Sequence, residues 1–455
     1  MKKLIALLLS VILVASTFAG CSSSDNEGTE DKKAGEQDIT NEGGDSASED
    51  VTKDRPYEGV EITYAGEAGG IFTEFYKRHI SDFTEATGIK VSFFEVAHEN
   101  THERFLTEAM GGTGSIDVYQ LDQPWVAEFA DLGYLEEITD DTKAEIDNFS
   151  DFSEAALETM TYNNTLYGLP FQYHTPVLFY RTDLFEAAGL TEPPKTWDEY
   201  REYAKILNDP DNGIYGTSIE AKAVPEPATH FLDKMAQAGA HYMDENGNAI
   251  FDSPETREAI QFLYNLQNVD KTSPEGAIGY DNTDVYNLFM QGKIAMVSEW
   301  PYFYAGSQDP EQSLVVGKVG VAAQPAGKYE SSALWTFGHG VSVSSKQKEA
   351  ALEFVKWSVS PEILAKLSIE ETTPVPRSSA NELVYASSEL SEDTKNVLKV
   401  IADASNKARN YTTTPNFPAV QLRLATTLSN IITGLKTMDE EVAATQKDLE
   451  SILAQ

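Results

Sequence analysis

The sequence predicts an α/β protein built from two domains. Its 455 residues exceed what one compact core usually holds and suit two domains of ordinary size. From Val60 onward, short β-prone runs alternate with segments whose apolar residues recur at helical spacing, which is typical of α/β folds. The stretch 166–207 joins two such pieces through a strand, a helix, a stiff Pro-Pro turn and a second helix. We therefore expect the chain to pass there from one domain to the other.

The first elements form a strand–helix–strand unit. Residues 60–64 predict a strand, residues 72–83 carry apolar side chains at helical spacing, and residues 89–96 predict a second strand. A strand, a crossover helix and a further strand favour parallel pairing. The next strand is predicted to end at Asp122, at the carboxyl edge where open α/β sheets place their ligands.

Local signals define the junction stretch in detail. Residues 177–180 are apolar and β-prone and predict a buried strand, and Gly189 is expected to end the helix that follows. Thr196 and Glu199 have the spacing of a capping box and predict a helix start. Further along, the patterns predict helices at 230–238, 254–267 and 348–359, a helix, Gly292 and a strand within 281–300, and a strand at 316–324.

Composition limits the possible partners. The chain is 41% hydrophobic and 24% charged, as soluble globular proteins are. Its formal net charge of -39 argues against nucleic acid, because a phosphate backbone requires a basic surface.

The N-terminus predicts export and lipid anchoring. Residues 1–20 have the basic start, short apolar run and small final residues of a secretory signal peptide. Cys21 is the only cysteine, so no internal disulfide is possible, and its place directly after Ala19-Gly20 predicts lipidation. Phe18 to Cys21 resembles a lipobox with Phe18 where Leu is usual. Residues 22–56 have almost no large apolar residue, so 21–56 is predicted to be a lipidated, disordered acidic tether.

Several segments together resemble one family. The quoted segments are FTEATGIKV from Phe83, DVYQLDQPWVAEFADLGYL from Asp117, YNLFMQGKIAMVSEW from Tyr286, WTFGHGVSVS from Trp335 and PVPR from Pro374. In this order they resemble the extracellular solute-binding proteins of bacterial sugar ABC importers, and the likeness runs from about residue 57 to 455.

The resemblance implies the two-lobed α/β periplasmic-binding-protein fold, with a hinge between the lobes. It places lobe 1 at 57–172 plus 340–376 and lobe 2 at 173–339 plus 377–455, with three hinge crossings. It further implies a monomer that is not an enzyme and has no metal or cofactor. This protein would capture a sugar, an oligosaccharide in particular, at the outer face of the cell membrane and deliver it to a permease of the importer.

The resemblance also implies a ligand site. Polar side chains would bind sugar hydroxyls, with His174 where members of the family place an acidic residue and His339 where many carry Trp. Trp300 would stack on a sugar ring, with core packing as the alternative, and the same choice holds for Trp125. The full set of predicted ligand-binding residues is Glu67, Asp122, Trp125, Gln172, His174, Trp300, Tyr302, His339 and Arg377.

Two alternatives stay open at this point. His98-Glu99-Asn100-Thr101-His102 matches the HExxH pattern of zinc proteases, although it follows a strand directly where such a motif belongs inside a helix. The other alternative keeps the fold and changes the ligand, because Glu67, Asp122 and Glu299 among aromatic residues would suit a cationic amine.

Overall fold

The computed structural model describes residues 55–97, 100–412 and 414–455. The predicted signal peptide, Cys21 and nearly all of the predicted tether lie outside these residues. Residues 53–455 form one compact unit. Within the described part of the chain, no helix is both long and apolar enough to cross a membrane.

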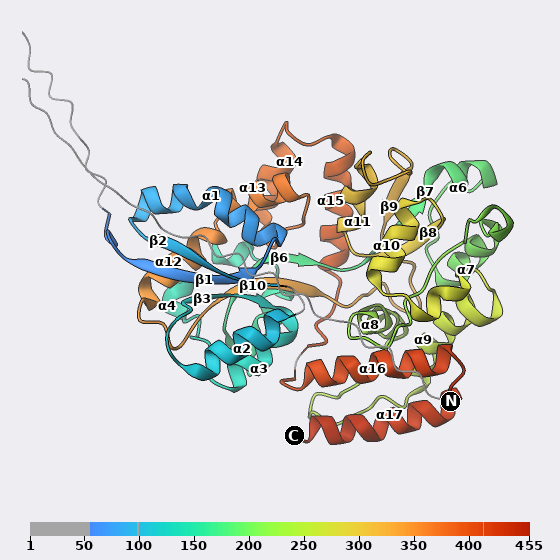
Figure 1. Cartoon of the computed structure of the whole chain (residues 1–455). Coiled ribbons are helices and arrows are strands. Elements are labelled where there is room, and N and C mark those ends of the chain that lie inside the picture. The colour runs from blue at the N-terminus through green and yellow to red at the C-terminus, as the bar shows by residue number, and fades with distance from the viewer. Residues whose placement is uncertain (1–54, 98–99, 413) are drawn as a thin grey trace, which may run out of the picture. The chain divides into compact units, whose positions relative to one another are not determined.

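A five-stranded sheet organises the first lobe, in the order β2-β1-β3-β10-β6. β1 (Glu61–Glu67) pairs in parallel with β2 (Lys90–Val96) and β3 (Val118–Asp122), which confirms the predicted strand–helix–strand unit. β10 (Trp335–Val341) runs antiparallel between β3 and β6 (Leu169–His174), so a late segment of the chain completes the sheet. Figure 1 shows α1 and α13 on one side of this sheet and α2 and α3 on the other.

The remaining elements of the first lobe are helices and one small hairpin. They are α1 (Ile71–Thr87), α2 (Thr101–Gly111), α3 (Gln123–Asp131), α4 (Asp140–Ala144), α5 (Glu154–Thr159), β4 (Thr161–Tyr162), β5 (Thr165–Leu166), α12 (Lys348–Ser358), α13 (Pro361–Glu371) and α14 (Ser378–Ala386).

A three-stranded antiparallel sheet, in the order β8-β7-β9, organises the second lobe. Its strands are β7 (Val177–Arg181), β8 (Met296–Glu299) and β9 (Val319–Ala322). Its helices are α6 (Thr182–Ala188), α7 (Trp197–Ile206), α8 (Pro227–Ala238), α9 (Pro254–Tyr264), α10 (Asn282–Met290) and α11 (Tyr302–Gln308), with α16 (Phe417–Ile432) and α17 (Met438–Leu453) at the C-terminal end. A π-helical turn, Asn265–Val269, extends α9.

The junction folds as its local signals predict. Gly189 ends α6 with a left-handed backbone at φ 74°, which glycine adopts without steric cost. The side chain of Thr196 accepts from the backbone N–H of Glu199, and Glu199 accepts from the backbone N–H of Thr196, so the predicted capping box is confirmed.

Separate hydrophobic cores underlie the two sheets, and the chain crosses between them three times. The first crossing follows β6, and there Thr175 Oγ1 donates to the carbonyl of Ala333, which lies on the second crossing, 2.9 Å away. Ala380 of α14 belongs to the first core, so the chain stays in the first lobe beyond residue 377. The third crossing leads from α14 to α15 (Glu392–Ser405), which packs against both β6 and β9.

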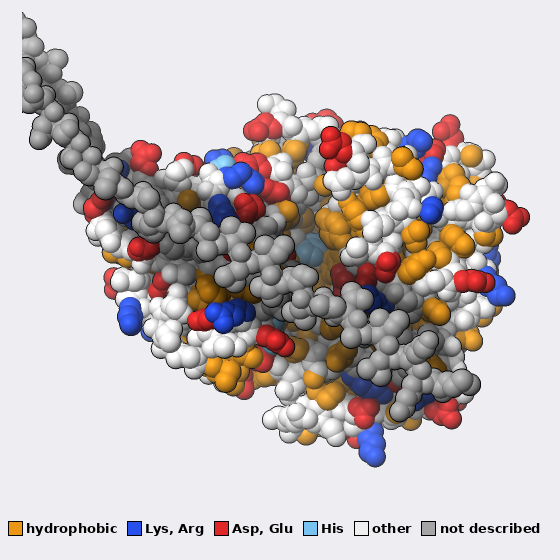
Figure 2. All heavy atoms as spheres, in the orientation of Figure 1, with side chains coloured by type: hydrophobic (Ala, Val, Ile, Leu, Met, Phe, Trp, Pro, Cys, Tyr) orange, Lys and Arg blue, Asp and Glu red, His pale blue; other side chains and the backbone are white. Residues whose placement is uncertain are grey.

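Charged side chains of both signs are dispersed on the face shown in Figure 2. On the visible part of the face in Figure 2, acidic groups are spread in small clusters with basic groups between them. Such a distribution favours solubility.

Candidate ligand-binding cleft

A cleft of about 670 Å³ lies between the two sheets, and both lobes contribute to its lining. This volume is in the range of small-molecule sites. The first lobe contributes Glu67, Ile71, Phe72, Asp122, Pro124, Trp125, Gln172, His174, Trp335, Phe337, Glu371, Thr372 and Thr373, and the second contributes Pro225, Glu226, Thr229, Asn282, Thr283, Trp300, Pro301, Tyr302, Pro418 and Gln421.

Strand direction explains why the first-lobe residues meet here. Glu67 ends β1 and Asp122 ends β3, and the carboxyl ends of parallel strands lie at one edge of a sheet. β10 is antiparallel, so its amino-terminal end reaches the same edge, where Phe337 pairs with Asp122 on one side and with Gln172 on the other. Trp125 follows in the first turn of α3.

Gln172 and His174 form a polar pair on β6. Gln172 Nε2 donates to His174 Nδ1 and, over 3.2 Å, to Thr373 Oγ1. Burial lowers the pKa of His174 to about 3, so the imidazole is neutral at physiological pH. Because Nδ1 accepts, the ring proton lies on Nε2. Gln172 Oε1 is buried and has no hydrogen-bond partner among the described residues.

Aromatic side chains form much of the wall. Trp300 directly follows β8 and is 9% exposed, and its ring lies edge-on to that of His174, 4.8 Å between centroids, and to that of Trp335, 6.0 Å away. Trp300 therefore packs against neighbouring rings and also lines the cleft. Tyr302 is 47% exposed and donates its hydroxyl proton to Asn282 Oδ1.

All the charged side chains described in the cleft lining are acidic. Four carboxylates line it, Glu67, Asp122, Glu226 and Glu371, and none of the described lining residues is Lys or Arg. Glu371 is paired with Arg78, which lies outside the lining. Carboxylates accept hydrogen bonds from hydroxyl or ammonium groups, whereas an anionic ligand would be buried here without a basic partner.

The structure corrects the prediction for His339. Its side chain is fully buried in the first lobe, stacked on Phe171 at 4.4 Å, with Nδ1 2.8 Å from Ser358 Oγ and Nε2 3.3 Å from the hydroxyl of Tyr64. The reason is the direction of β10. Its amino-terminal end lies at the cleft, so His339, two residues beyond Phe337, lies deeper in the sheet opposite Gln120.

Arg377 is likewise a core residue and does not line the cleft. It is 1% exposed and donates to Asp151 Oδ1 (2.7 Å), to the carbonyl of Val359 (2.9 Å) and to the carbonyl of Asp147 (2.6 Å). Its guanidinium also lies over the ring of Phe152, 4.7 Å from the centroid. These contacts hold the side chain in the core, where it ties α14 to the loop before α5.

Glu299 also lies away from the cleft lining, buried behind Trp300. Of the HExxH pattern, His98 and Glu99 fall outside the described residues. His102 lies in the first turn of α2, with Nε2 2.6 Å from Glu128 Oε2.

Sequence reasoning missed several lining residues. The main ones are Phe72, Glu226, Asn282, Trp335 and Phe337. Trp335 and Phe337 stand in the segment already quoted for the family, and recognising β10 as antiparallel would have selected them over His339. Asn282 and Glu226 each stand at the start of a helix, α10 and α8, which is a weaker signal.

Comparisons with known proteins agree with this architecture. A curated relative from Sinorhizobium fredii, described as a probable amino-acid ABC transporter periplasmic-binding protein, is 25% identical over 88% of this chain and 90% of its own length. The mannitol-binding protein of Pseudomonas aeruginosa is 26% identical over 65% of this chain and 71% of its own. The solved structure of maltose-bound MalE3 from T. maritima has a TM-score of 0.75 and 26% identity, covering 86% of this chain and all of that one. The family model for bacterial extracellular solute-binding proteins matches residues 69–365, and the chain belongs to this family.

Proposed function

We propose that this protein is the extracellular sugar- or polyol-binding component of an ABC importer. One observation carries the proposal: a cleft between two lobes combines aromatic faces with carboxylate and amide acceptors and has no basic residue among its described lining. Sugar hydroxyls need acceptors, and the C–H faces of sugar rings pack on aromatic rings. The ligands named for two relatives, maltose and mannitol, are of this class.

The chemistry of the lining argues against an amino acid, the ligand class named for the relative from S. fredii. An amino acid carries an α-carboxylate, which would be desolvated next to Glu67, Asp122 and Glu226 with no basic lining residue described. The zinc-protease and amine alternatives gain no support from the family or from these relatives.

The mechanism we propose is capture by closure. The lobes are joined by three crossings, of which the first two are held together by the hydrogen bond between Thr175 and Ala333. Bending at these crossings would bring Trp300 and Tyr302 of the second lobe toward Trp125 and Asp122 of the first, around a bound sugar. The closed form would then deliver the sugar to a permease of the importer.

A ligand screen tests the proposal. Purified protein is heated with sugars, polyols, amines and amino acids, because a ligand that binds only the folded state raises the melting temperature. We expect a sugar or polyol to raise it, and calorimetry then gives the dissociation constant. Asp122→Asn should weaken binding of that ligand, whereas Asp140→Asn, at a side chain 97% exposed on α4, should not. A response to amino acids alone would contradict the proposal.

We further propose that Cys21 is lipidated and anchors a monomer to the outer face of the cell membrane, with residues 22–56 as the tether. A single sulfur accepts the lipid, so Cys21→Ala should release the protein into the medium or leave the signal peptide attached. A mature-sized Cys21→Ala protein that stays in the membrane fraction would contradict this anchor.

A further inference from the structure

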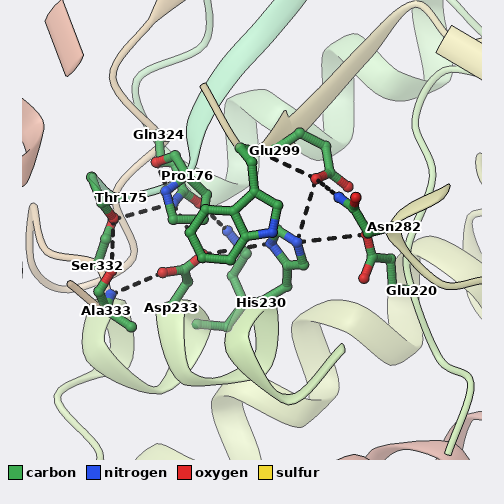
Figure 3. A network of polar contacts seen from close by, with 12 residues as sticks. Thr175, Pro176, Glu220, His230, Asp233, Asn282, Glu299, Gln324, Ser332 and Ala333 are labelled. Atoms are coloured by element: carbon green, nitrogen blue, oxygen red, sulfur yellow. Dashed lines mark hydrogen bonds and ion pairs between the residues drawn. The ribbon is translucent and has the colours of Figure 1, made fainter. Parts of the chain in front are cut away.

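A buried cluster of titratable groups lies in the second lobe behind the cleft wall. Glu220 comes from the segment before α8, His230 from α8 and Glu299 from the end of β8. Glu220 is 5% exposed and Glu299 1%. Figure 3 shows His230 directed toward both glutamates, with Asn282 beside Glu299.

Hydrogen bonding within the described residues leaves this cluster incomplete. Neither carboxylate oxygen of Glu220 nor Nε2 of His230 has a hydrogen-bond partner there. Glu299 is better satisfied, because its Oε2 accepts from Asn282 Nδ2 at 2.8 Å and from the backbone N–H of Trp300 at 3.3 Å. Buried polar atoms without partners are rare in native proteins, and each needs a partner such as an ordered water or an ion.

The distances within the cluster suit a metal ion better than direct hydrogen bonds. His230 Nε2 lies 3.6 Å from Glu220 Oε1 and 3.5 Å from Glu299 Oε2, beyond the usual hydrogen-bond length. Ligand atoms about 2.0–2.2 Å from a tetrahedral Zn²⁺ are separated from one another by roughly 3.3–3.6 Å. One ligand atom from each residue lies within 4.8 Å of the other two. A cavity of about 40 Å³ adjoins them and would hold an additional water ligand.

The charges point the same way. Two carboxylates lie close together away from water, where a cation would offset their charge. A divalent ion bound by two carboxylates balances their two negative charges. The other ring nitrogen, Nδ1 of His230, faces Asp233 Oδ2 at 3.7 Å, which is also beyond hydrogen-bond length.

We propose that Glu220, His230 and Glu299 bind one divalent transition-metal ion, with Zn²⁺ as the best match to this set of ligands. The site departs from the metal-free protein that the sequence predicts. Glu299 directly precedes Trp300, and the rings of His230 and Trp300 lie 5.6 Å apart. The ion therefore fixes the end of β8 and, through it, the cleft wall.

The test is metal binding by the full chain in the absence of sugar. Protein stripped with a chelator is titrated with Zn²⁺ by calorimetry, with Ca²⁺ as a contrast ion. We expect one Zn²⁺ per chain and, at a free concentration 100 times the dissociation constant, a roughly 100-fold lower unfolding equilibrium constant. Glu220→Gln and His230→Asn should each abolish stoichiometric binding. Glu330→Gln, at a side chain 75% exposed, should bind like the unaltered protein.

A second readout locates the ion. Co²⁺ at this site would quench the fluorescence of the nearby tryptophans Trp300 and Trp197, and Trp300→Phe should reduce the quenching while metal stoichiometry stays at one. The stripped protein failing to bind Zn²⁺, or Glu220→Gln binding it unchanged, would overturn the proposal. The proposal would also be overturned if Glu220→Gln had a higher melting temperature than the unaltered protein and the unaltered protein did not bind Zn²⁺. That result would mean that Glu220 and Glu299 share a proton instead of a metal ion. None of these outcomes depends on which sugar the cleft binds.

Discussion

Replacing Trp300 by Ala tests the cleft wall most directly, because this ring is both packed and facing the ligand. A tryptophan buries about 150–250 Å², and at about 25 cal/mol per Å² this amounts to ~4–6 kcal/mol, an upper estimate. With 9% of the residue exposed, nearly all of that contribution is present before a ligand arrives. We therefore expect Trp300→Ala to lower the free energy of unfolding of the ligand-free protein by ~3–5 kcal/mol.

The same substitution should weaken ligand binding by ~2–4 kcal/mol, or about 30- to 1000-fold in dissociation constant, because aromatic anchors dominate binding energy. Urea unfolding of the ligand-free protein and calorimetry with the ligand from the screen measure the two effects separately. Trp300→Phe is the matched control, since it keeps an aromatic face and should lose less of both. An unchanged dissociation constant for Trp300→Ala would refute the contact with ligand, and unchanged unfolding would refute the packing.

Three further predictions follow from the contacts described above. Arg377→Met should lower the free energy of unfolding in urea by ~3–5 kcal/mol, because it leaves buried Asp151 without its cation. The dissociation constant of the ligand should not change. Weaker ligand binding at unchanged stability would show instead that Arg377 belongs to the binding site. Burial lowers the pKa of His339 from its ordinary 6.5 to about 3, so the unfolded state binds the proton first and stability falls as pH drops through this window. His339→Gln should make the melting temperature depend less on pH between about pH 6 and pH 4, where uptake of one proton changes stability by up to ~1.4 kcal/mol per pH unit. An unchanged pH dependence in the variant would contradict the lowered pKa of His339. Thr196→Ala should cost ~0.5–2 kcal/mol by removing the cap of α7, and Thr196→Ser, which keeps the hydroxyl, should cost less.

Short sequence patterns were enough to predict many of the helices, strands and turns. The strand at β7, the αL stop at Gly189 and the capping box at Thr196 each depend on a few neighbouring residues, and each forms as predicted. The sequence predicts Asp122 at the end of a strand, and the residue lies there, at the edge of the cleft. Such features are readable because backbone geometry and apolar periodicity are properties of short segments.

The misplaced residues depend on long-range geometry instead. Whether His339 or Trp335 reaches the cleft is decided by the direction of β10, and that direction is set by pairing with strands more than 160 residues earlier. The side chain of Arg377 points to Asp151, a partner that no spacing in the sequence indicates. The cluster of Glu220, His230 and Glu299 likewise unites three separated segments and shows no motif.

The position of β10 also sets an order of events for the chain as it is made. A chain that has emerged only as far as His174 holds β1, β2, β3 and β6, yet in the sheet β6 has β10 as its only described neighbour. The missing strand follows about 160 residues later, which at 5–20 residues per second takes ~8–30 s of synthesis. The sheet of the first lobe therefore lacks β10 until most of the second lobe has been synthesised. Such a delay would suit the export that residues 1–20 predict, because a chain that has not finished folding can still be threaded through a membrane.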